Sequence, residues 1–154
     1  MMKYIPVIIL YTTILFACNN STSKDGNTTA HDKPANHADS LLKDVMDGHD
    51  AAMGKMSKLS SAQKRTLQAI DSINKLPEKQ KNAVTGYKTA LDSLSEKLNR
   101  AKVSMDKWMD EFNYDTATTG SNREAYLESE NKKITNVKDV MTAALQKADS
   151  LFKK

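Results

Sequence analysis

The sequence is poor in residues that cross-link chains or interrupt helices. Its 154 residues contain one cysteine, three prolines and five glycines, and only 6% of them are aromatic. A single cysteine excludes an intrachain disulfide, so the fold must be stabilised by packing alone. Turn signals at the short, regular spacing of an all-β protein are also missing. These absences favour a few long helices, and the chain length fits one domain.

The sequence also lacks long blocks of charge of one sign. The formal net charge is +4, from 23 Lys and Arg against 19 Asp and Glu. Charges of both signs alternate along the helical segments, which is typical of a solvated surface. This composition argues against nucleic acid as a partner.

The only long apolar run lies near the amino terminus, from Tyr4 to Phe16, directly after Lys3. Spanning a bilayer takes about 20 apolar residues, so this run is too short for a membrane helix. A short apolar run behind a positive residue is typical of a signal peptide. We therefore predict a signal peptide over residues 1–17.

The end of this run carries the sequence Leu15-Phe16-Ala17-Cys18. It resembles the lipobox of bacterial lipoproteins, which implies cleavage before Cys18 and attachment of two or three acyl chains such as palmitate. Several acyl chains anchor a protein firmly where one binds only marginally. Asn19 follows in place of the Asp that retains enterobacterial lipoproteins in the inner membrane, so we expect the outer membrane, with its periplasmic or surface face left open.

Residues 18–37 contain no apolar periodicity and are rich in Asn, Thr and Ser. We expect this segment to be a flexible tether between the lipid and a domain formed by residues 38–154. Two of the three histidines, His31 and His37, fall in the tether. His49 alone falls in a helical segment.

Three amphipathic segments follow, over about 39–74, 77–113 and 121–152, with a loop at 113–120. The middle segment has nine uncharged positions at alternating spacings of three and four: Val84, Tyr87, Leu91, Leu94, Leu98, Ala101, Met105, Trp108 and Phe112. The first stripe is Leu42, Met46, His49, Met53, Met56, Leu67 and Ile70. The third is Leu127, Glu130, Ile134, Val137, Met141, Ala144, Ala148 and Leu151. Ser121 and Glu124 have the spacing of a capping box at the start of the third segment.

Long helices joined by short connections must fold back on one another. We predict an all-α protein, an elongated antiparallel three-helix bundle of coiled-coil type. The alternative is an open helical hairpin that completes its core by self-association, because the nine apolar positions of the middle helix suit a partner chain equally well.

Turns near residues 75–77 and 117 set the register of the three helices. They bring together, at the end distal to Pro77, Met46, His49, Met53, Met105, Trp108, Met109, Tyr126 and Glu130. Two of these residues are polar at core positions. Because burying either one alone is costly, His49 and Glu130 are candidates for a polar pair in the core. The alternatives are a core histidine with another hydrogen-bond partner, or a boundary site where both side chains reach water.

The same cluster suggests a soft-metal site. Met46 and His49 lie one helical turn apart, with Met53 one turn further, and Met105 and Trp108 lie on the facing helix. Thioether and imidazole ligands suit Cu(I) or Ag(I), and the Met-x-x-His pair is similar to those of periplasmic helical silver-binding proteins. The alternative is that these methionines only fill gaps in the core.

No motif of a known enzyme class is present. The sequence has no glycine-rich phosphate loop, no His-Glu-x-x-His and no cysteine free to attack a substrate. We therefore expect no enzymatic activity. The leading interpretation is a non-catalytic structural or interaction module of the cell envelope, and soft-metal binding is the alternative.

The helical segments resemble a group of short lipoproteins of the Bacteroidota that have no assigned activity, many of which carry the label "viral A-type inclusion protein". The first segment contributes Val45-Met46-x-x-His49-Asp50, the second Asp106-x-Trp108-Met109, and the third Tyr126-Leu127-x-x-Glu130. The resemblance implies a helical lipoprotein and supplies no reaction.

The triplet of Asp, then Ser or Thr, then an apolar residue occurs five times in the chain. It is similar to an O-glycosylation acceptor of exported Bacteroidota proteins. Four copies fall in helical segments, where amphipathic repetition explains them. The fifth, Asp115-Thr116-Ala117, falls in the expected loop, so we predict Thr116 as the glycosylated residue.

Overall fold

The computed structural model describes residues 36–153. They form three long helices, α1 (His37–Asn74), α3 (Thr85–Glu111) and α5 (Arg123–Phe152), and two short ones, α2 (Glu78–Ala83) and α4 (Tyr114–Thr119). The predicted signal peptide and Cys18 lie outside the described residues, as does most of the predicted tether. Of the helices described, none combines the length and the hydropathy needed to cross a membrane.

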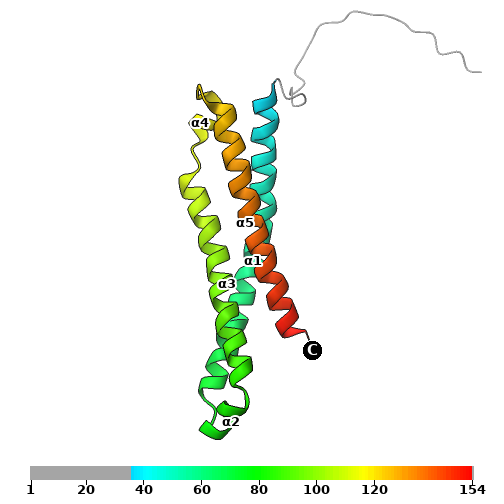
Figure 1. Ribbon diagram of the computed structural model, residues 1–154, viewed down its shortest axis with the longest axis vertical. Coiled ribbons are helices and arrows are strands. Elements are labelled where there is room, and N and C mark those ends of the chain that lie inside the picture. Colours follow the sequence, from blue (N-terminus) through cyan, green and yellow to red (C-terminus); the bar gives the residue numbers. More distant parts are fainter. Residues whose placement is uncertain (1–35, 154) are drawn as a thin grey trace, which may run out of the picture. The chain divides into compact units, whose positions relative to one another are not determined.

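The three long helices form an up-and-down bundle, which confirms the predicted all-α class. α1 begins near α4 and runs toward α2, α3 returns in the opposite direction, and α5 runs parallel to α1 (Figure 1). Each long helix packs against the other two. The fully buried side chains of α3 and α5 include Leu94, Leu98, Met105, Leu127, Ile134 and Met141.

The predicted stripes of the second and third segments are confirmed almost throughout. In α5, the residues from Leu127 to Ala148 of the stripe are buried and only Leu151 is half-buried. In α3, the stripe is buried from Leu91 to Trp108. Its ends differ, because Val84 and Phe112 are half-buried and Tyr87 is 41% exposed.

The predicted stripe of the first segment is wrong by one position. α1 buries Leu41, Val45, Gly48, Ala52 and Leu59, each one residue from the expected set or between its members. The cause is a close contact between α1 and α5. A Cβ placed on Gly48 would lie 3.0 Å from Cγ2 of Ile134. Small residues let the two helices approach, and Met53 is left 40% exposed.

The connections also differ from those expected. The middle segment is interrupted at Val84, whose φ of −113° and ψ of 12° leave the helical region and separate α2 from α3. The expected loop at 113–120 contains α4, whose first turn is capped by Asn113 Oδ1, which accepts from the Thr116 N–H at 2.8 Å.

The capping box predicted at Ser121 and Glu124 does not form. The N-cap of α5 is Asn122, and it makes no side-chain capping bond. The first turn of α5 is held instead by Arg123. Its Nε donates to the carbonyl of Ala117 at 2.7 Å, and its Nη2 donates to the carboxylate of Asp39 on α1.

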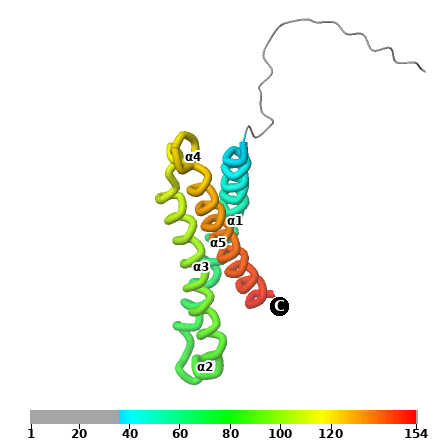
Figure 2. Tube along the Cα trace, turned by 45° about the horizontal axis from the view of Figure 1, so that its top comes forward, coloured from blue at the N-terminus to red at the C-terminus, as the bar shows by residue number. Residues whose placement is uncertain are grey.

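The long helices end at different levels. α5 ends beside Arg65, whose guanidinium lies 4.2 Å from the centre of the Phe152 ring and whose Nη2 donates to the Phe152 carbonyl at 3.5 Å. Beyond this level α1 and α3 continue as a two-helix hairpin closed by α2 (Figure 2). We call the half of the bundle that contains this hairpin, residues 55–102 and 138–153, the α2 end, and the other half, residues 36–54 and 103–137, the α4 end.

Two glycines of α1 offer a matched test of the close contact. A Cβ placed on Gly54 would have nothing within 4 Å, whereas one on Gly48 would face Ile134. Gly54→Ala should raise the free energy of unfolding by about 1 kcal/mol, because alanine costs less helix entropy than glycine. Gly48→Ala should raise the free energy of unfolding clearly less than Gly54→Ala does, or should lower it, because the added methyl group must fit against Ile134. Equal stabilisation of both variants in urea unfolding would contradict the observed packing of α1 on α5.

Candidate functional site

A row of aromatic rings crosses the bundle near the α4 end. His49 of α1 lies 5.6 Å from Trp108 of α3, measured between ring centres. Trp108 stacks on Phe112 at 4.9 Å, and Phe112 lies 6.1 Å from Tyr126 of α5. The hydroxyl of Tyr126 accepts a hydrogen bond from the Asn113 N–H at 2.7 Å. The predicted meeting of His49, Trp108 and Tyr126 at this end is confirmed.

The methionines predicted for the same cluster are divided between core and surface. Met105 is fully buried, and Met46 is half-buried. Met53 and Met109 are 40% and 39% exposed. For the methionines of α1 the reason is the rotation of this helix about its axis. Val45 and Gly48 occupy the inward positions that the sequence pattern assigned to Met46 and His49.

The predicted pair of His49 and Glu130 does not form, and each residue has another partner. Nδ1 of His49 lies 2.9 Å from Oδ1 of Asp50 on the same helix. Oε1 of Glu130 accepts from Nζ of Lys133 at 2.7 Å. Because Gly48 takes the position facing α5, the imidazole is directed to α3 and away from the carboxylate.

Glu130 is the one acidic side chain buried in the part of the chain described here. It is 1% exposed, while Lys133 keeps half of its side chain in solvent. The hydrogen bond to Glu130 is the main cause that raises the pKa of Lys133 above its ordinary value, and desolvation opposes it. The second oxygen, Oε2, has no hydrogen-bond partner within residues 36–153, and the same holds for Nε1 of Trp108.

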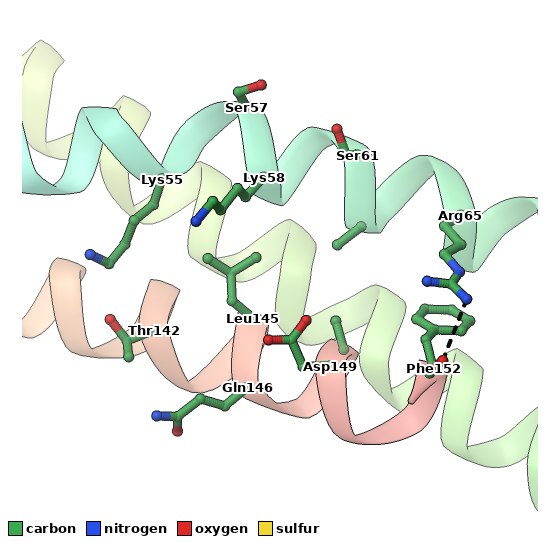
Figure 3. Close-up of a pocket in the computed structure, with 12 residues that line it drawn as sticks. Lys55, Ser57, Lys58, Ser61, Arg65, Thr142, Leu145, Gln146, Asp149 and Phe152 are labelled. Atoms are coloured by element: carbon green, nitrogen blue, oxygen red, sulfur yellow. Dashed lines mark hydrogen bonds between the residues drawn. The ribbon is translucent and has the colours of Figure 1, made fainter. Parts of the chain in front are cut away.

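Two shallow grooves flank the second half of α5, and neither was predicted from the sequence. Figure 3 shows the first, of about 430 Å³, which is lined by Lys55, Lys58 and Arg65 of α1 and by Thr142, Gln146 and Asp149 of α5. The second, of about 410 Å³, lies between α3 and α5. Its cations are Lys97, Arg100 and Lys147, over a floor that includes Val140 and Ala144.

These grooves belong to a larger separation of charge between the two ends of the bundle. The α4 end, residues 36–54 and 103–137, carries five Lys and Arg against eleven Asp and Glu. The α2 end, residues 55–102 and 138–153, carries fourteen Lys and Arg against six Asp and Glu. Along the sequence the signs alternate, so the separation appears only when the three helices are aligned. One end of the bundle is therefore acidic and the other basic.

Thr116 lies in α4 and not in an exposed loop. It is half-buried, and a Cβ placed on Gly120 would lie 2.8 Å from its carbonyl oxygen. The prediction of a loop at 113–120, from which Thr116 was chosen, is wrong. Glycosylation of Thr116 stays a prediction.

Comparison of the chain with protein-family models, curated proteins and solved structures gave no match. The fold itself defines the class, an antiparallel three-helix bundle. The resemblance to short Bacteroidota lipoproteins stays a prediction.

The pair of Lys133 and Glu130 offers a test of what holds the buried charge. Lys133→Met should lower the free energy of unfolding by about 1–3 kcal/mol, because it leaves a buried carboxylate without its donor. Lys132→Met, at the neighbouring exposed position, should change it by less than about 0.5 kcal/mol.

The pH dependence of this difference has a definite sign. The folded-state pKa of Lys133 is raised, so the stabilisation by the pair is fully present below the ordinary lysine value of 10.5 and is lost as pH rises through the raised pKa. The gap between wild type and Lys133→Met, measured by urea unfolding, should therefore narrow above pH 10.5. An equal effect of both lysine substitutions at neutral pH would show that Glu130 does not depend on Lys133.

Proposed function

We propose that this protein is a lipid-anchored, non-catalytic interaction module of the bacterial cell envelope, held at the outer membrane by acyl chains on Cys18. The signal-like run from Tyr4 to Phe16 and the lipobox-like Leu15-Phe16-Ala17-Cys18 support the anchor. The chain enters the bundle at His37, so the anchor joins the α4 end. The α2 end is then the part farthest along the bundle from the point of attachment.

The observation that carries the interaction role is the uncovered α2 end. α5 ends at Phe152 while α1 and α3 continue, so among residues 36–153 no third long helix covers one face of the hairpin. Leu67 is 51% exposed and Tyr87 is 41% exposed there. A groove lined by Arg65, Gln68, Ala69, Ser72, Tyr87, Leu151 and Phe152 runs along this face. Apolar side chains within a basic surface suit an acidic partner surface with apolar contacts of its own.

The anchor is tested by replacing the acceptor. The Cys18→Ser variant should carry no acyl chains. Once its signal peptide is removed it should leave the membrane fraction, because the acyl chains are what anchors the mature protein. Intact-mass spectrometry of the wild type should give a chain that begins at Cys18 with its acyl chains attached. A wild-type protein that is cleaved elsewhere or carries a free thiol would overturn the anchor.

The interaction face is tested by photo-crosslinking in cells at two positions of equal exposure. Leu67 at the α2 end and Val103 at the α4 end are both 51% exposed. A photoreactive residue at position 67 should give a discrete protein adduct, and one at position 103 should not. Adducts of equal yield at both positions, or none at 67, would contradict a partner site at the α2 end. An adduct with a second copy of the chain would identify the partner as self-association.

A second candidate function, binding of Cu(I) or Ag(I), is favoured by the contact between His49 and Trp108. Imidazole and thioether ligands suit these ions, and the half-buried Met46 lies one turn from His49. An indole face close to the imidazole can interact with a bound cation. Titration with Ag(I) should then shift the NMR signals of His49 and of the Met46 and Met105 methyl groups. Unchanged signals would exclude this candidate.

A further inference from the structure

Three potential metal ligands meet at the α4 end, away from the aromatic row. They are His37, the first residue of α1, and Glu124 and Glu128 in the first two turns of α5. One ring nitrogen and one oxygen from each carboxylate all lie within 4.8 Å of one another. Nε2 of His37 is 3.5 Å from Oε1 of Glu124. His37 was predicted to lie in the tether, so this meeting was not anticipated.

The charges around these ligands favour a cation. Glu124 and Glu128 are four residues apart on one helix, a spacing at which like charges repel. Among residues 36–153, neither carboxylate forms an ion pair with a lysine or an arginine. The neighbouring Arg123 pairs with Asp39. The whole α4 end carries an excess of acidic residues. Among the described residues, the ion-pair partner of these carboxylates is therefore His37, which lies beside Glu124.

We propose that His37, Glu124 and Glu128 form a binding site for a divalent transition-metal ion of borderline softness, with Zn²⁺ as the representative ion. One imidazole and two carboxylates are ligands that Zn²⁺ accepts, and water completes an exposed site of this kind. The imidazole distinguishes the site from an acidic patch for Ca²⁺ or Mg²⁺, which prefer all-oxygen ligands. The absence of thioether ligands distinguishes it from a site for Cu(I) or Ag(I).

The bound ion would join the first residue of α1 to the first two turns of α5. The ion pair between Arg123 and Asp39 already links the same two helices close by. A ligand that binds the folded state alone stabilises it by mass action, so Zn²⁺ should raise the melting temperature of the bundle. The site would thereby fasten the bundle at the point where the chain from the anchor enters it.

The test uses the full chain in detergent with Cys18→Ser, so that no thiol competes for metal. Isothermal titration should give one Zn²⁺ per chain. His37→Ala and Glu128→Gln should each weaken binding by at least about tenfold and abolish the rise in melting temperature. The three ligands are exposed, so these variants should keep the helix content of the parent by circular dichroism.

Matched controls separate this site from general metal binding. His49→Ala removes the histidine of the aromatic row, His31→Ala removes a histidine that precedes the site in the sequence, and Glu111→Gln removes an acidic charge of the α4 end. All three should bind Zn²⁺ as the parent does. Zn²⁺ binding that survives His37→Ala or Glu128→Gln would overturn the proposal, as would the absence of binding. Equal binding of Ca²⁺ would reduce the site to an acidic surface and would overturn it too.

Discussion

The close contact of α1 with α5 determines how the rest of the bundle is arranged. Gly48 lies against Ile134, and Val45 and Ala52 continue this face one turn to either side. With these small side chains turned inward, His49 is directed to α3, where it meets Trp108. Glu130 is then without the imidazole and takes Lys133 as its partner. The rotation of α1 about its own axis therefore decides which partners His49 and Glu130 have.

The sequence predicted most reliably those helices whose buried faces consist of large residues. In α3 and α5, leucine, isoleucine and methionine recur at heptad spacing, and this apolar area both drives packing and makes the pattern visible. In α1 the inward face includes Val45, Gly48 and Ala52 where it contacts α5, while larger methionines flank it. A search for large apolar side chains misses such a face, because small side chains stabilise the packing by letting the two helices approach closely. The predicted inward face of α1 is displaced by one residue, or about 100° around the helix axis. A displacement of this size is enough to give a side chain a different partner.

The level at which residues meet was predictable where their angular position was not. Two turns fix the register of antiparallel helices, so His49, Trp108 and Tyr126 were expected at one end and are found there. Features that depend on alignment of all three helices left no local signal. The separation of acidic and basic ends is hidden by alternation along the chain. The approach of His37 to Glu124 joins residues far apart in sequence, and only the fold brings them together.

The early end of α5 gives the molecule two regions of unequal local stability. Among residues 36–153, the parts of α1 and α3 beyond Phe152 have no third long helix beside them, and α2 contributes no buried residue. Segments with few buried apolar contacts open more often than the body of a protein, without global unfolding. Amide hydrogens in the last turns of α1 and the first turns of α3 should therefore exchange with solvent faster than those beside Ile134. The hairpin can therefore fray and reclose while the three-helix part stays folded.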